Sequence, residues 1–343
     1  MTRYLSRRSV IAGTLALASL SRSFAAATAQ PAGSTSLQAV LSYVRSQKTT
    51  GFLVIQDRKV LVEENWPAPD DRLFKNFTYE RTSEGALLED VASQQKSFVS
   101  MLVAIAVDKG LLDVSRPVAD FIGPGWSKAT REQEAGIRVI DVLAMSSGLT
   151  TDFTYQAPPG TVFLYNTPVY AITKKILAAA AKQPLETITR DWLTAPAGMS
   201  NTSWRKRPAL FGDVGNPTGL VTSPRDTAKF GQIVLDHGKA ADGKRIVSET
   251  QLNAIFSRAP TNPAYGRLWW LNGSPYTIKP LARRVPGPLI PAAPADLVAA
   301  LGALDRKLYI VPSKKLLVVR LGAATPDENF DQQLWLRLMQ ALG

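Results

Sequence analysis

The two ends of this chain of 343 residues carry matching patterns of secondary structure, and these patterns constrain its fold most strongly. Near the N-terminus, apolar spacing predicts an amphipathic helix over residues 36–47, and apolar runs at 52–55 and 60–63 flank a turn and predict a β-hairpin. Near the C-terminus, runs at 308–311 and 316–320 predict a second hairpin, which a last helix follows. We therefore expect the two ends to build one antiparallel sheet covered by helices.

The middle of the chain predicts mostly helices. A helix over residues 94–109 ends at Gly110, a residue suited to a helix C-terminus. Ser223 followed by Pro224 is typical of a helix start, and a further helix begins near Ser248. These patterns predict an α/β (α+β) fold in which an antiparallel sheet is flanked by helices and carries an inserted, mostly helical lobe.

We predict a single domain over residues 36–343. Its α/β part comprises residues of about 36–92 and 245–343, and its helical lobe comprises residues of about 93–244. Residues 257–296 are rich in proline and glycine, so we expect long loops there that line a site.

The first 29 residues differ in character from the rest. A charged start with paired arginines at Arg7 and Arg8 precedes a short apolar stretch and a small-residue site at 27–29. This order is typical of a signal peptide of the twin-arginine type, and it predicts a periplasmic or secreted protein. No later apolar run is long enough to span a bilayer, so we do not expect an integral membrane protein.

The amino-acid composition limits the kinds of catalytic and binding site that the chain can form. The chain has no cysteine and one histidine, which excludes thiolate chemistry and argues against an imidazole-rich metal site. The formal net charge is +12, of which four charges come from arginines before residue 29. The remaining excess is scattered rather than gathered with aromatic residues, so we expect no nucleic-acid partner. We also predict no metal and no cofactor, and the sequence leaves the oligomeric state open.

A serine and a lysine one helical turn apart, Ser93 and Lys96, are the strongest candidates for a reactive pair. Residues at this spacing share one helix face, and apolar residues after them predict that the helix packs on a core. A second pair at the same spacing, Ser203 and Lys206, has no apolar period behind it and is predicted to lie in a loop.

The pair offers a physical route to nucleophilic catalysis. A hydroxyl is a weak nucleophile until a base removes its proton. Lysine serves as that base only if burial or nearby cations lower its pKa, and a helix N-terminus favours both this shift and the binding of an oxyanion. The alternative is that Ser93 only caps the helix and Lys96 is a solvated residue.

Further motifs follow in a characteristic order. They include Gly110-Leu-Leu-Asp113, Pro159-Gly-Thr-Val-Phe-Leu-Tyr165, and the run of residues 219–231 that begins Gly-Leu-Val-Thr-Ser-Pro. From about residue 36 to the end, the chain resembles the β-lactamase-related serine hydrolases. This family includes class C β-lactamases, D,D-peptidases, family VIII esterases and 6-aminohexanoate-oligomer hydrolases. The resemblance implies the β-lactamase/transpeptidase-like fold and a serine that becomes acylated.

The resemblance assigns Ser93 as nucleophile, Lys96 as its proton partner and Tyr165 as a general acid/base. The family pattern Tyr-x-Asn is altered here, because Asn166 directly follows the tyrosine. Asn166 is predicted to take over a polar contact with Lys96 or with the substrate.

The third family motif, a Lys-Thr-Gly-like strand, has no counterpart in this sequence. The expected place reads Ala299-Ala-Leu-Gly-Ala-Leu304, as in a branch where glycine lets the backbone approach the substrate. Gly302 and the backbone N–H near Ala303 are therefore predicted to bind substrate and oxyanion, and Trp269 to line an acyl pocket. The missing cation argues against efficient β-lactam hydrolysis.

The predicted function is that of an exported serine hydrolase that cleaves a small-molecule ester or amide through an acyl-enzyme on Ser93. Two alternatives remain open. One is a D,D-peptidase or β-lactamase that acts on peptidoglycan-like substrates. The other is a non-catalytic ligand-binding or sensor protein on the same fold.

Overall fold

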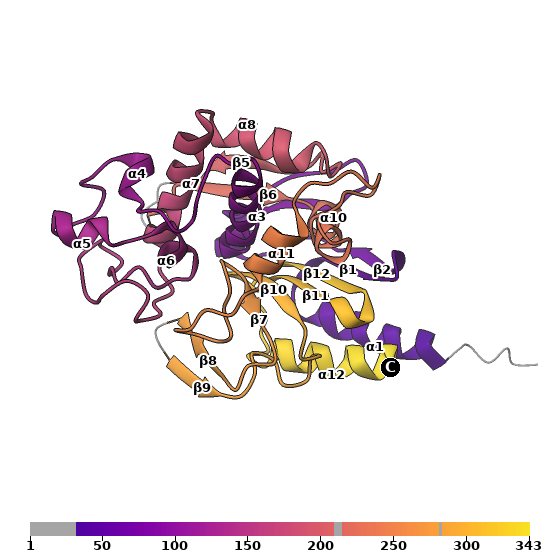
Figure 1. The fold of residues 1–343 in the computed structure, drawn as a ribbon. Coiled ribbons are helices and arrows are strands. Elements are labelled where there is room, and N and C mark those ends of the chain that lie inside the picture. Colours follow the sequence, from indigo (N-terminus) through magenta and orange to yellow (C-terminus); the bar gives the residue numbers. More distant parts are fainter. Residues whose placement is uncertain (1–31, 209–214, 281–282) are drawn as a thin grey trace, which may run out of the picture.

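The computed structural model describes residues 32–208, 215–280 and 283–343. Its main element is a six-stranded antiparallel sheet with the order β2-β1-β12-β11-β10-β7 (Figure 1). The strands are β1 (Thr49–Gln56), β2 (Lys59–Asn65), β7 (Trp270–Leu271), β10 (Val298–Gly302), β11 (Arg306–Val311) and β12 (Leu316–Gly322).

The two chain ends meet at the centre of this sheet. β1 pairs with β12 in antiparallel register, with Leu53 opposite Val319 and Val54 opposite Val318. Every residue of β11 and β12 is buried, because helices cover both faces of these strands, whereas the edge strand β2 is mostly exposed. The predicted sheet from both chain ends and the predicted fold class are confirmed.

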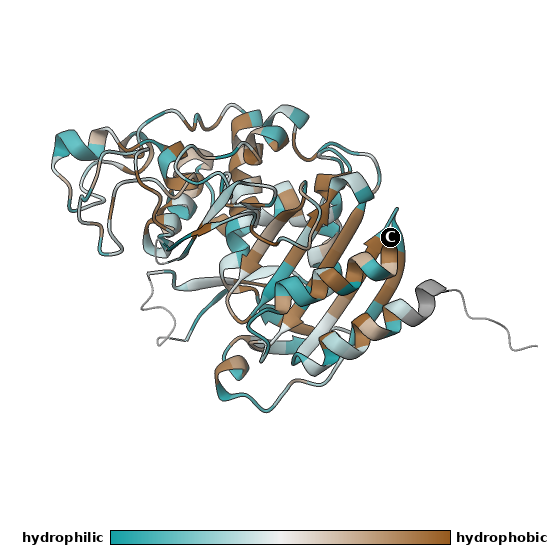
Figure 2. Ribbon diagram, turned by 90° about the horizontal axis from the view of Figure 1, so that it is seen from below, coloured by the Kyte–Doolittle hydropathy of each residue, from teal (hydrophilic) through white to brown (hydrophobic). Residues whose placement is uncertain are grey.

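Two layers of helices enclose the sheet. The terminal helices α1 (Ala32–Ser46) and α12 (Phe330–Leu342) pack on each other and cover one face (Figure 2). On the other face, α10 (Pro224–Leu235) packs on β1, β11 and β12, and α3 (Gln95–Asp108) packs on β10. The predicted starts of α10 at Ser223 and of α11 (Glu249–Ile255) at Ser248 are confirmed, since each serine accepts a hydrogen bond from the third residue of its helix.

The segment between β2 and β7 contains strands as well as helices. A four-stranded sheet with the order β3-β4-β6-β5 lies beside the main sheet (Figure 1). Its strands are β3 (Thr78–Arg81), β4 (Leu87–Asp90), β5 (Ser203–Lys206) and β6 (Thr218–Thr222). The prediction of a loop at residues 203–206 was wrong: these residues form β5, which pairs with β6 and has no apolar run of its own.

The remaining elements are short, with one exception. α7 (Thr167–Ala181) is long and buries one side against α3. The others are α2 (Arg72–Lys75), η1 (Ala92–Gln94), α4 (Ala119–Ile122), α5 (Arg131–Ala135), α6 (Val139–Leu143), α8 (Leu185–Thr189), η2 (Arg190–Thr194), η4 (Pro312–Lys314) and the hairpin β8 (Tyr276–Lys279) with β9 (Arg283–Pro286). Within the described residues, no helix combines the length and the apolar character needed to cross a membrane. The predicted signal peptide lies outside the described residues.

Candidate active site

Ser93 lies on the short 3₁₀ turn η1, between strand β4 and the long helix α3. The residue before it, Ala92, has a φ of 49°, in the left-handed region that alanine rarely adopts. Its backbone N–H donates a 2.8 Å hydrogen bond to the carboxylate of Asp90, which holds the turn in this conformation. The serine is therefore presented from a sharply bent, anchored segment.

Lys96 stands one turn further along, with its amine directed at Ser93. The Lys96 Nζ atom lies 2.8 Å from Ser93 Oγ and 3.1 Å from Thr167 Oγ1. The rings of Tyr165 and Tyr170 enclose the amine, with their centroids 4.8 and 4.7 Å away. Lys96 is only 2% exposed, so it is not the solvated residue of the alternative reading.

The surroundings of Lys96 favour an uncharged amine. Burial lowers its pKa well below the usual value, and the positive charges of Arg207 and Lys174 lower it further. Among the residues that the structure describes, no carboxylate lies within ion-pair distance of Lys96. An amine in this state can accept the proton of a neighbouring hydroxyl.

Tyr165 approaches Ser93 from the segment just before α7. Burial raises the pKa of Tyr165 to about 12, an increase that the neighbouring Ser93 hydroxyl partly offsets. The ring stacks on Trp270, with centroids 5.8 Å apart and planes inclined by 22°. Tyr165 is therefore a protonated phenol beside the serine, suited to donate or relay a proton rather than to act as the first base.

Asn166 does not contact Lys96, which was one of the two partners predicted for it, and a contact with the substrate stays a prediction. Its side chain caps α7 by accepting a 3.1 Å hydrogen bond from the Val169 N–H, and its amide donates to the Leu149 carbonyl at 2.9 Å. The next residue, Thr167, makes the polar contact with Lys96 instead. The part of the prediction that concerns Lys96 failed because it considered only the position next to the tyrosine.

Gly302 and Ala303 lie at the turn between β10 and β11 and face the serine. A Cβ atom on Gly302 would stand 2.2 Å from the Val91 carbonyl oxygen and 3.2 Å from the Gln94 backbone nitrogen. Glycine is thus required because the strand end packs directly on the turn that carries Ser93. The close approach that requires glycine is thus to the protein's own chain, and the predicted approach of this backbone to the substrate stays a prediction.

A cavity of about 390 Å³ opens beside these groups, a volume usual for a small-molecule site. Trp270 lines it, whereas the predicted Trp269 does not. Trp269 is 0% exposed and packs between Phe230 and Phe256 in the core, because neighbouring residues near a strand point to opposite sides. The cavity is lined by Ser93, Tyr165, Trp270, Lys279, Pro280, Leu289, Leu301, Gly302, Ala303 and Asp331.

Sequence reasoning missed two charged residues of this cavity. Lys279 comes from β8, within the segment where we expected loops lining a site. Asp331 comes from α12 and is already engaged, because its carboxylate lies 3.0 Å from Lys307 Nζ and accepts a hydrogen bond from the Tyr309 hydroxyl. A cation is therefore present at the cavity, although the strand β10 supplies none.

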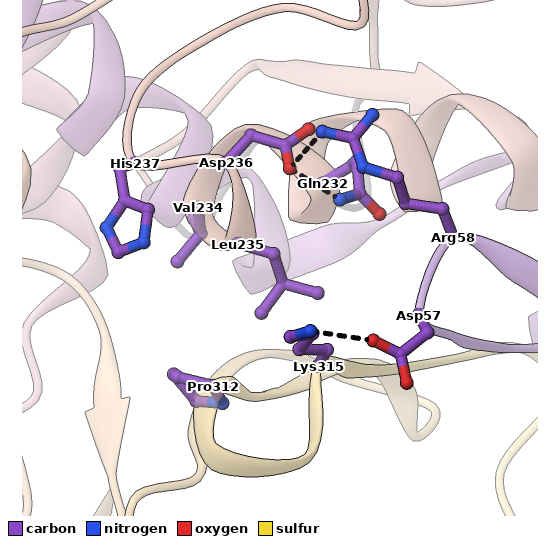
Figure 3. A pocket seen from close by; sticks show the side chains of 9 residues that line it. All are labelled: Asp57, Arg58, Gln232, Val234, Leu235, Asp236, His237, Pro312 and Lys315. Carbon is purple, nitrogen blue, oxygen red and sulfur yellow. Dashed lines mark hydrogen bonds and ion pairs between the residues drawn. The ribbon is translucent and has the colours of Figure 1, made fainter.

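A second cavity, of about 360 Å³, lies at the opposite end of the sheet, where the β1–β2 and β11–β12 turns meet the end of α10 (Figure 3). Its acidic residues are paired, with 2.7 Å between Asp236 and Arg58 and 3.0 Å between Asp57 and Lys315. His237, the only histidine of the chain, lines this cavity. The histidine therefore has no place beside Ser93.

In the described part of the chain, no group of three or more histidine and acidic residues is arranged to hold a metal ion. The polar groups around Ser93 are instead hydroxyls and amines, which suit proton transfer.

In this site a serine contacts a buried lysine at the start of a helix, beside an antiparallel sheet. This geometry is typical of serine hydrolases that form acyl-enzymes. The chain belongs to the family described as Beta-lactamase, which it matches over residues 44–342. The resemblance predicted from the sequence is thereby confirmed, and fold and family indicate a serine hydrolase of the β-lactamase type.

Individual relatives agree with this placement. Penicillin-binding protein 4 of Amycolatopsis lactamdurans is 26% identical over 202 residues, which cover 46% of this chain and 53% of that protein. The chain thus matches about half the length of this curated relative.

Three solved structures share the fold. A putative β-lactamase from Bacteroides dorei superposes with a TM-score of 0.68 and 14% identity, covering 90% of this chain and 98% of that one. A putative 6-aminohexanoate-dimer hydrolase from Bacillus anthracis gives 0.65 and 16%, covering 88% and 81%. A β-lactamase/D-alanine carboxypeptidase from Yersinia pestis gives 0.62 and 15%, covering 90% and 97%.

Proposed function

We propose that this protein hydrolyses small-molecule esters or amides through an acyl-enzyme on Ser93. The observation that carries the proposal is the 2.8 Å contact between Ser93 Oγ and the buried amine of Lys96. A serine beside an uncharged lysine has its base in place, which the reaction requires. Catalysis by the Lys96–Ser93 pair also explains why the site needs no histidine.

In the proposed reaction, Ser93 Oγ attacks the carbonyl carbon while its proton passes to Lys96 Nζ. The N–H groups of Ser93 and Ala303 stabilise the oxyanion of the tetrahedral intermediate. Tyr165, which lies beside Ser93, gives its proton to the leaving alcohol or amine as the bond to it breaks, and it takes up in exchange the proton that Lys96 holds. A water molecule then attacks the acyl carbon and loses a proton to Lys96. Lys96 returns this proton to Ser93 Oγ as the bond between Oγ and the acyl carbon breaks, which releases the acid and restores the Ser93 hydroxyl.

The cavity supports a substrate with an apolar acyl or leaving group. Trp270, Leu289 and Leu301 form much of its wall, and Trp270 also stacks on Tyr165. Contact with such surfaces favours burial of alkyl or aromatic groups. Short-chain and aromatic esters are therefore the first substrates to test.

A second candidate function has one observation in its favour. Lys279 lines the cavity and has no ion-pair partner among the described residues. A free cation near the serine suits a substrate that bears a carboxylate, as in a D,D-peptidase or β-lactamase. If the protein hydrolyses nitrocefin and Lys279→Ala loses this activity, the result favours a D,D-peptidase or β-lactamase over a general esterase.

The decisive test is labelling of the purified protein with a serine-reactive fluorophosphonate. We expect labelling of the wild type and none of Ser93→Ala. Ser203→Ala is a matched control, since Ser203 has a lysine at the same spacing but lies on strand β5. Undiminished labelling of Ser93→Ala would refute the proposal.

A substrate panel then separates a hydrolase from a binding protein. It comprises short-chain p-nitrophenyl esters, linear amides and nitrocefin, each assayed with the wild type and Ser93→Ala. Multiple turnovers that need Ser93 support the hydrolase. Stoichiometric acylation without turnover supports the sensor alternative.

We further propose that the protein is exported and acts in the periplasm or outside the cell. The paired Arg7 and Arg8, with the apolar stretch and small residues that follow, support this. Replacement of both arginines by lysine is expected to retain the protein inside a bacterial host. Fractionation of cells that express each form tests the proposal, and equal export of both would contradict the twin-arginine route.

A further inference from the structure

A cluster of buried charges lies behind Ser93. It contains three basic side chains, Lys96, Lys174 and Arg207, and one carboxylate, Asp90. Arg207 and Asp90 form a paired unit, because two guanidinium nitrogens donate to the carboxylate at 2.7 and 2.9 Å. Within the described residues neither lysine has a carboxylate at ion-pair distance. Two buried lysines without a counterion are unfavourable if both are charged.

The hydrogen-bond partners of the two lysines indicate which amine carries the positive charge. Lys174 Nζ donates to Asn216 Oδ1 at 2.7 Å, to the Thr218 carbonyl at 2.9 Å and to Thr218 Oγ1 at 3.1 Å. Three oxygen partners match the three donors of an ammonium group, and a carbonyl and an amide oxygen can only accept. The face of Trp204, 4.5 Å from the nitrogen, is a further favourable neighbour of a cation.

Lys96 has the opposite kind of partner. Its polar contacts are the hydroxyls of Ser93 and Thr167, each of which can donate a proton to a neutral amine. Lys96 and Lys174 lie 4.7 and 5.8 Å from the centroid of the same Tyr170 ring, so their nitrogens are at most 10.5 Å apart. At this distance, across a buried aromatic ring, the charge of one amine strongly affects the other.

We propose that Lys174 is a positioning residue for the reacting proton: its ammonium, held by Asn216 and Thr218, keeps Lys96 uncharged so that it can accept the proton of Ser93. The inference rests on the proposed function of Ser93 and Lys96. It assigns a role to a residue that touches neither the serine nor the cavity.

The pKa shifts of the two lysines agree with a charged Lys174 beside an uncharged Lys96. Burial lowers the pKa of Lys174 to about 7, and it lowers the pKa of Lys96 well below its usual value. Lys174 is therefore charged below about pH 7, where its repulsion opposes protonation of Lys96. The other ionisable groups that act on the two amines or pack around them are Asp90, Arg207, Tyr165, Tyr170 and Tyr265.

The test is the pH dependence of the rate at which Ser93 reacts with a fluorophosphonate. In the wild type the rate falls on the acid side as Lys96 becomes protonated. Lys174→Met removes the repelling charge, so the pKa of Lys96 rises and the acid limb moves to higher pH by about one unit. At the wild-type midpoint the variant then reacts roughly fivefold more slowly. Lys175→Met, an exposed neighbour on the same helix, is the control and leaves the limb in place.

A second variant protects the test against misfolding of the first. Asn216→Asp keeps the side-chain size and places a carboxylate against Lys174, so it offsets the same charge without removing the lysine. The acid limb is again expected at higher pH, and circular dichroism verifies the fold of both variants. An unmoved limb in a folded variant would overturn the inference while leaving the proposed function intact. A wild type that does not react at all would overturn both.

Discussion

The close packing of Gly302 on the Ser93 turn makes a sharp prediction for Gly302→Ala. The added Cβ would lie 2.2 Å from the Val91 carbonyl oxygen, whereas real Cβ atoms essentially never come within 3.0 Å of such an atom. The next nearest atoms, the Gln94 backbone nitrogen and the Arg306 Cβ atom, are each 3.2 Å away, and since all three atoms are in or attached to the backbone, no side-chain rotation relieves the clash. Either the end of β10 or the turn at 91–94 must move by about 1 Å.

The displacement acts on the serine directly, because Val91 and Gln94 flank it on both sides. A shift of about 1 Å in a reacting group typically costs about 10²-fold in rate, so we expect kcat/KM for a p-nitrophenyl ester to fall by about 10- to 100-fold. Overpacking of this kind costs about 1–3 kcal/mol, which corresponds to a loss of about 2–5 °C in Tm.

The assay compares steady-state kinetics and thermal unfolding of Gly302→Ala with those of Gly136→Ala. Gly136 has an ordinary φ of −80°, and its nearest atom to an added Cβ is 3.4 Å away, so this control should stay within twofold of the wild type. If Gly302→Ala keeps wild-type kcat/KM and Tm, the close approach does not fix the serine and the reasoning fails.

Three further predictions follow from the site. Asp90→Asn leaves its buried arginine unpaired and is expected to lower the free energy of unfolding by about 3–5 kcal/mol, measured by urea titration. A profile of kcat/KM against pH should fall on the acid side, because Lys96 becomes protonated there. Near pH 10, where about half of free tyrosine is ionised, the profile should show no loss from Tyr165, because the pKa of Tyr165 is raised to about 12. Trp269→Ala should cost about 3–5 kcal/mol of stability, whereas Trp270→Phe should raise KM by about tenfold with little change in the urea midpoint.

The parts of this fold that depend on local pattern were predictable from the sequence. The apolar runs at both ends predicted the central strands, because buried strands need continuous apolar stretches. Ser223 and Ser248 predicted helix starts, because a serine side chain satisfies the free N–H groups of a first helical turn. Ser93 and Lys96 were predictable as a pair because residues three positions apart lie on one face of a helical turn.

The remainder depends on tertiary packing. Strand β5 has a polar sequence and forms because β6 lies beside it, which no local pattern reveals. The choice between Trp269 and Trp270 depends on which side of a two-residue strand faces the cavity. The contact from Thr167 to Lys96 spans 71 residues of sequence, and it depends on how α7 packs against α3.

The central position of β12 also has a consequence for how the chain folds. β1 lies between β2 and β12, so its inner edge stays unpaired until residues 316–322 have been made. Such late, long-range pairing slows folding and leaves an apolar strand edge open to other chains. A chain that stops before residue 316 would keep Ser93, Lys96 and Tyr165 yet lack the strand that closes the sheet. We therefore expect such truncated chains to aggregate, whatever the integrity of their reactive residues.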